Sequence, residues 1–140
     1  METAINLEIK AIQHIGIPVT NVVISALFYS KLGFSNVMER HFDHNGAQGT
    51  CIMMKRGDII IELYQMPAEV LPEIAVRKDG HIDHVAFDVA DIDEAFDIIK
   101  QGGFDIIEPE PVFLQFWEKG CKYFNITGPD GERLEFNQVL

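Results

Sequence analysis

The chain contains an internal repeat that spans most of its length. Residues 12–35 (IQHIGIPVTNVVISALFYSKLGFS) align without gaps on residues 82–105 (IDHVAFDVADIDEAFDIIKQGGFD), at an offset of 70 residues. Each copy begins with an apolar alternating stretch, continues into a capped segment of helical length and ends in Gly-Phe. A duplication constrains the fold strongly, because both copies must adopt the same local structure and then cover each other's apolar surface. Five of the 24 aligned positions are identical: Ile12/Ile82, His14/His84, Val19/Val89, Gly33/Gly103 and Phe34/Phe104.

Each copy predicts a strand, a helix and then three further strands. Apolar residues at every second position open both copies, which is the pattern of a strand. Asn21 in the first copy and Asp91 in the second are the predicted N-caps of the helices, and Gly-Phe closes each helix. Strand-like runs follow at 36–43, 48–56 and 58–65 in the first half and at 104–108, 120–127 and 132–138 in the second.

The repeat extends to the last strand of each half, where residues 61–65 (IELYQ) match residues 134–138 (LEFNQ). The predicted fold class is therefore α+β, with two tandem βαβββ modules forming a curved mixed sheet in one domain, residues 1–140. Half-modules 9–65 and 81–140 are joined by a linker, residues 66–80, which contains two prolines and a Lys-Asp-Gly turn. A half of about 60 residues with one sheet cannot easily cover its apolar face, so the two halves should pack or pair.

Charge and composition exclude several classes of partner. The 22 acidic and 11 basic residues give a formal charge of −11, which repels nucleic acid, and the basic residues form no patch. No stretch has the length of a membrane span, and the N-terminal residues METAINLEIK lack the apolar core of a secretory signal. Cys51 and Cys121 are far apart and are interpreted as buried apolar residues rather than a disulfide or zinc site. We therefore expect a cytoplasmic protein with a small-molecule substrate.

Histidine and glutamate recur together in the two halves. His14 and His84 lie in the opening strands, and Glu62 and Glu135 lie in the closing strands. Two imidazoles and two carboxylates bind a divalent transition metal well. If pseudo-twofold symmetry brings these four strands together, the side chains converge on one site without any local spacing motif.

A simpler interpretation applies to each of these residues taken singly. A lone histidine in an apolar strand is usually a hydrogen-bonded core residue, and a glutamate in such a strand often faces solvent. Recurrence at equivalent positions of a duplicated unit favours shared metal ligation instead. Gly16 and Ala86 follow the two histidines on the same face of their strands and would leave room beside each imidazole.

This arrangement resembles the vicinal oxygen chelate superfamily, which includes glyoxalase I, methylmalonyl-CoA epimerase, extradiol dioxygenases and the fosfomycin and bleomycin resistance proteins. The resemblance covers residues 9–138, and its most specific local signal is the turn Gly128-Pro129-Asp130-Gly131 before the strand that ends in a ligand. It implies one divalent ion (Ni, Co, Zn, Mn or Fe) held by four side chains: His14, Glu62, His84 and Glu135.

Four protein ligands are what glyoxalase I and the epimerase use, whereas extradiol dioxygenases and fosfomycin transferases use two histidines and one glutamate. The resemblance therefore implies a metal-dependent lyase or isomerase of the glyoxalase I type. In such an enzyme the metal holds two vicinal oxygens and stabilises an enediolate, with Glu135 or Glu62 as the catalytic base. Three alternatives remain open: a methylmalonyl-CoA epimerase-like racemase, a non-catalytic drug-binding resistance protein and an extradiol-type dioxygenase.

Two departures bear on the substrate. Pro18 and Met66 stand where glyoxalase I typically has an arginine and an asparagine that contact glutathione.

Residues 111–117, an aromatic stretch, are predicted as a loop that either packs in the core or forms a lid excluding water from the metal. A homodimer is expected because such modules leave sheet edges and apolar faces uncovered. The native metal, the substrate and whether the site forms within one chain or across two stay open.

Overall fold

The computed structural model describes residues 3–77, 83–127 and 133–140. The chain divides into two compact units: a first unit, His14–Asp83, and a second unit, Met1–Gln13 together with His84–Leu140. The boundary between Gln13 and His14 falls inside strand β1 (Ala11–Pro18). Within the described ranges, no helix has the length and apolar character needed to cross a membrane.

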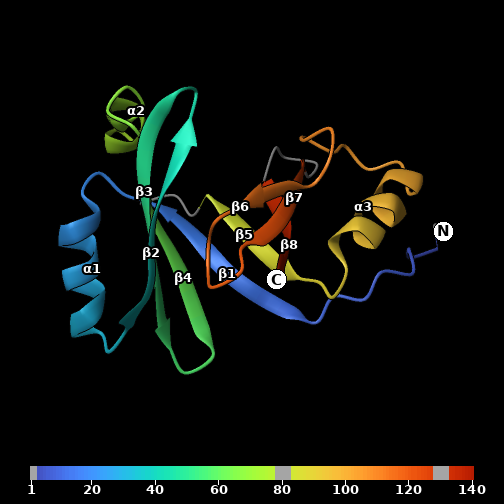
Figure 1. Ribbon diagram of the computed structural model, residues 1–140, viewed down its shortest axis with the longest axis horizontal. Coiled ribbons are helices and arrows are strands. Elements are labelled where there is room, and N and C mark those ends of the chain that lie inside the picture. Colours follow the sequence, from blue (N-terminus) through green and yellow to red (C-terminus); the bar gives the residue numbers. More distant parts are fainter. Residues whose placement is uncertain (1–2, 78–82, 128–132) are drawn as a thin grey trace. The chain divides into compact units, whose positions relative to one another are not determined.

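The first unit is a mixed sheet with a helix on one face (Figure 1). Its strands β2 (Ser35–His44), β3 (Ala47–Arg56), β4 (Ile59–Gln65) and β1 follow one another in that order. β4 is antiparallel to β3 and parallel to β1. Helix α1 (Val22–Lys31) packs against β3 and β4. The buried core between them consists of Val22, Ile52, Met54, Ile61 and Leu63.

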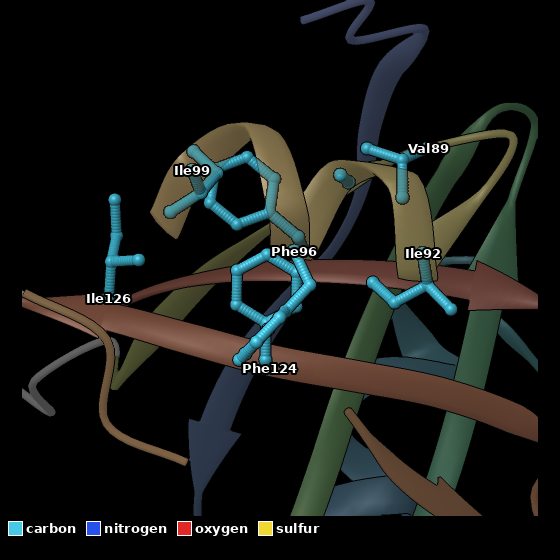
Figure 2. Close-up of a cluster of buried hydrophobic side chains, with 8 residues drawn as sticks. Val89, Ile92, Phe96, Ile99, Phe124 and Ile126 are labelled. Carbon is cyan, nitrogen blue, oxygen red and sulfur yellow. The ribbon is translucent and has the colours of Figure 1, made fainter. Parts of the chain in front are cut away.

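The second unit repeats this plan with strands β5 (His84–Asp88), β8 (Arg133–Val139), β7 (Cys121–Thr127) and β6 (Val112–Leu114), in that order. β5 is parallel to β8, and helix α3 (Ile92–Gln101) packs against β7 and β8. Figure 2 shows Ile92 and Phe96 pointing from the helix toward the strand that carries Phe124. The Phe96 and Phe124 rings meet edge to face with their centroids 5.1 Å apart.

The helix boundaries confirm the predicted caps. Asn21 accepts hydrogen bonds from the backbone N–H groups of residues 23 and 24, and Asp91 accepts from those of residues 93 and 94. Gly33 and Gly103 both have positive φ, +89° and +77°, as predicted for glycines that end a helix. The α+β fold class with two βαβββ modules is therefore confirmed.

One hydrogen bond in each unit shows how closely the copies agree. Gln65, the last residue of β4, accepts from the backbone N–H of Val22 at 2.9 Å. Its counterpart Gln138 in β8 accepts from the backbone N–H of Ile92 at 3.0 Å. In both units a glutamine from the closing strand thus satisfies a backbone donor in the first turn of the helix.

The strand predicted at 104–108 is wrong. Ile106 forms only an isolated bridge with Ile126, and the carboxylate of Glu108 accepts from the backbone N–H of Asn125 at 2.6 Å. The Glu108 side chain thus accepts from a backbone N–H of β7 that would otherwise donate to the carbonyl of a paired strand. Pro109 cannot continue the pairing because it has no backbone N–H. β7 pairs with β8 on one side, and on its other side it pairs with β6, which lies within the aromatic stretch predicted as a loop.

Two further predictions concern the connections. The predicted linker, residues 66–80, contains a short helix, α2 (Leu71–Ala75), with a proline in its first turn where no helical N–H is required. The predicted turn at residues 128–131 lies outside the described residues, as do linker residues 78–80.

Candidate functional site

The first unit contains a buried histidine beside a glutamate. His14 is 1% exposed, and its Nε2 lies 3.9 Å from Oε1 of Glu62, whose side chain is 12% exposed. The parallel register of β1 and β4 sets Gly16 opposite Glu62, and His14 lies two residues earlier on the same face of β1. Because glycine has no side chain, the carboxylate can lie over the neighbouring strand and approach the imidazole.

The second unit contains the equivalent pair. Nε2 of His84 lies 3.5 Å from Oε1 of Glu135, and these side chains are 7% and 9% exposed. Here Ala86 is the small residue opposite the glutamate in the parallel register of β5 and β8. The structure therefore brings the four predicted ligands together as two pairs, one inside each unit.

Each glutamate also receives a donor that the sequence interpretation missed. The thiol of Cys51 donates to Oε2 of Glu62 at 3.8 Å. In the second unit Nδ2 of Asn137 donates to Oε2 of Glu135 at 3.0 Å. These hydrogen bonds hold the orientation of each carboxylate.

The two cysteines lie in corresponding strands but at different registers, because Cys51 in β3 is opposite Tyr64 of β4, whereas Cys121 in β7 is opposite Val139 of β8. Both are buried free thiols, as predicted. The sulfur of Cys121 accepts from Nδ2 of Asn137, at 3.9 Å, so it contacts the residue that holds Glu135.

Gln13 is a further polar residue that sequence reasoning did not find. Its side chain is buried in the second unit, where Nε2 donates to Oδ1 of Asp88 and to the backbone carbonyl of Asn137, both at 3.1 Å. The repeat places Asp83 at the equivalent position of the other copy, so no recurring residue type marks Gln13.

The geometry of each pair suits a divalent metal. Two ligands that bind one ion at about 2.0–2.2 Å lie roughly 3–3.5 Å apart, close to the separations of 3.5 and 3.9 Å within the two pairs. Buried carboxylates next to imidazoles also supply charge that a buried cation requires. Imidazole and carboxylate ligands together favour zinc, nickel, cobalt, manganese or iron over calcium.

Comparison with known proteins decides the family. The sequence model of the Glyoxalase/Bleomycin resistance protein/Dioxygenase superfamily matches residues 11–136, nearly the whole chain. The chain belongs to this superfamily. Its members typically bind a divalent metal, and they include the vicinal oxygen chelate enzymes that the sequence resembles.

Three proteins illustrate what the chain is similar to. The chain is 30% identical over 131 residues to the uncharacterized protein YwbC of Bacillus subtilis (strain 168), covering 92% of this chain and 98% of the relative. A solved hypothetical protein of Bacillus halodurans C-125 is 24% identical over 92% of this chain and 94% of its own, with a TM-score of 0.72. Methylmalonyl-CoA epimerase from Mycobacterium tuberculosis is 18% identical over 99% and 93%, with a TM-score of 0.76.

The structure shows where Pro18 and Met66 lie, the two positions at which the sequence differs from glyoxalase I. Pro18 is the last residue of β1 and is buried, and Met66 directly follows β4 and is half-buried. Neither side chain offers the guanidinium or amide donors that glyoxalase I directs at glutathione. Within the aromatic stretch, Phe116 is buried and Phe113 is exposed on β6.

Proposed function

We propose that this superfamily member is a metal-dependent lyase or isomerase of the glyoxalase I type. One divalent ion would be held by His14, Glu62, His84 and Glu135. The observation that carries the proposal is the presence of one buried histidine–glutamate pair in each unit, at equivalent positions of the repeat. The chance that two unrelated core histidines each acquire a glutamate at the same place is small.

Chain connectivity supports the use of both pairs by one ion. His14 directly follows Gln13 in β1, so their Cα atoms are about 3.8 Å apart. Gln13 donates to the backbone carbonyl of Asn137, and the side chain of Asn137 donates to Glu135. The first ligand of one pair is therefore covalently attached to a residue anchored beside the other pair.

The side chains then have distinct roles. The four side chains would hold the ion, which when bound would supply positive charge that offsets negative charge developing on the substrate oxygens. The two imidazoles hold the ion, and Glu62 or Glu135 takes a proton from one carbon and returns it to the neighbouring carbon. Glu135 is buried and the Glu62 side chain is only 12% exposed, which limits exchange of that proton with water.

Metal content tests the ligand set. Chelator-treated protein is reconstituted with a divalent metal and measured by mass spectrometry for wild type, Glu62→Gln, Glu135→Gln and the control Glu118→Gln, which changes an exposed glutamate outside both pairs. We expect about one ion per chain in wild type and control, and at least 10-fold weaker binding in the other two variants. Loss in only one variant would contradict the four-ligand site, and a wild type without metal would favour a binding module.

A second candidate is an epimerase that inverts a carbon beside a thioester. Two observations favour it: the solved methylmalonyl-CoA epimerase aligns over 99% of the chain, and Pro18 and Met66 provide no contacts for glutathione. Both candidates use the same metal, and both begin with removal of a proton from a carbon beside a carbonyl group. The epimerase returns the proton to the opposite face of the same carbon, whereas the lyase returns it to the neighbouring carbon.

Substrate assays separate these candidates. The metal-loaded protein is incubated in D₂O with methylmalonyl-CoA and, separately, with the hemithioacetal of methylglyoxal and glutathione. Deuterium entering the α-carbon of the thioester, detected by mass spectrometry and lost in Glu135→Gln, supports the epimerase. Formation of the lactoyl thioester supports the lyase. Oxygen uptake with a catechol and ferrous iron would overturn both.

A further inference from the structure

Helix α1 presents an apolar surface to solvent. Its side chains are hydrophobic on nearly every face, and no acidic residue lies in its first turn. The inner face is accounted for by packing on β3 and β4, but four large side chains of the helix and that of its C-cap, Leu32, point elsewhere and are 48–65% exposed. We call them the α1 patch: Val23, Ile24, Leu27, Phe28 and Leu32.

The second unit provides an internal comparison. Helix α3 occupies the same place in its own βαβββ module, and the offset of 70 pairs each residue of α1 with one of α3. At the positions of Val23, Ile24 and Leu27, helix α3 carries acidic residues, Asp93, Glu94 and Asp97. The fold therefore accepts a charged outer face at these positions, and the apolar character of the α1 patch is not required by the module.

The size of the α1 patch matches one half of a small protein interface. Side chains of this type expose on the order of 100 Å² each at this degree of exposure, so the patch exposes about 500 Å². A pair of such patches would bury about 1,000 Å², the size at which specific interfaces begin. A single patch that contacts an identical patch forms a closed, self-complementary contact.

Charge favours a second copy over a membrane. The chain has a formal charge of −11, whereas helices that lie on membranes have a basic polar face that attracts anionic lipids. The α1 patch contains no charged residue, so two copies can bring it together without placing like charges opposite each other. The net negative charge of the remaining chain disfavours contacts between copies elsewhere.

We propose that the α1 patch is the contact surface of a homodimer in which α1 of one copy packs against α1 of another around a twofold axis. The proposal does not depend on the metal or on the reaction.

Sedimentation equilibrium tests the dimer. The test variant Val23→Asp/Ile24→Glu/Leu27→Asp gives α1 the residues that α3 carries. The control variant Gln48→Glu/Gln101→Glu/Gln115→Glu adds the same charge at exposed positions outside the patch. We expect wild type and control to dimerise alike and the test variant to dimerise about 100-fold or more weakly. Acidic residues in the first turn favour a helix, so circular dichroism should show that the test variant is folded.

A single cysteine tests the twofold contact. Leu27→Cys, at the middle of α1, should form a disulfide-linked dimer under mild oxidation, because both native thiols are buried. The matched control Asp97→Cys, at the equivalent position of α3, should stay monomeric on a non-reducing gel. A monomeric wild type at 100 µM or more, equal dimerisation of all variants, or binding of the monomer to phosphatidylcholine vesicles would overturn the proposal.

Discussion

At the scale of single residues, the site depends on side chains that hold the glutamates as much as on the ligands themselves. Asn137 is buried two residues after Glu135 on the same face of β8, and its amide donates to the carboxylate at 3.0 Å. A fixed carboxylate loses less conformational freedom when a metal binds. Asn137 therefore acts as a positioning residue for the proposed metal.

We expect Asn137→Leu to weaken metal binding about 10-fold or more, because it removes the donor to Glu135 while keeping a similar volume. Competition with a chromophoric chelator measures the affinity. The matched control is Asn36→Leu, since the amide of Asn36 also lies near a glutamate, Glu39, at 3.4 Å, but on an exposed strand. Equal affinities for both variants and wild type would show that Asn137 has no part in holding the ligand.

At the scale of elements, each closing strand is tied to the helix of its own unit by one glutamine. The Gln138 side chain satisfies the backbone N–H of Ile92, and Gln65 does the same for Val22. These bonds link the start of the helix to the strand that carries the glutamate ligand. They therefore connect helix stability to the position of the site.

We expect Gln138→Met and Gln65→Met each to lower the free energy of unfolding by about 1–2 kcal/mol, because a half-buried N–H loses its acceptor. Urea denaturation measures the change. Gln115→Met, at an exposed position, should change stability by no more than about 0.5 kcal/mol. If the three variants unfold at the same urea concentration, water satisfies the freed backbone N–H groups with little loss of stability.

At the scale of the whole molecule, the distribution of the two pairs has a thermodynamic consequence. One pair belongs to each compact unit, so a single ion that uses both would bind only while both units are folded. Binding to the folded state alone raises the free energy of unfolding. The metal should therefore act as a link between the two halves of the repeat.

At a free metal concentration of about 100 times Kd, we expect stabilisation of about 2.7 kcal/mol, which corresponds to a rise in Tm of about 8 °C for a chain of this size. Differential scanning calorimetry with and without chelator measures the shift. Glu62→Gln and Glu135→Gln should both show a smaller shift although they alter different units. A full shift in either variant would place the bound metal elsewhere.

The sequence alone determined the local elements and the candidate ligands. Caps at Asn21 and Asp91, closing glycines and alternating strands are written in short stretches of chain, because hydrogen bonds within a few residues decide them. The recurrence of histidine and glutamate at equivalent positions of the repeat was enough to identify the residues of both buried pairs.

Only the tertiary structure decided which residues lie across from one another. The parallel register set Gly16 opposite Glu62, and the strand that pairs with β7 across from β8 formed at β6 and not at residues 104–108. The contact of Asn137 with Glu135 and the exposed α1 patch depend on side-chain direction and burial, which a sequence pattern does not contain. Contacts between distant residues follow from the packing of whole elements, so no local stretch encodes them.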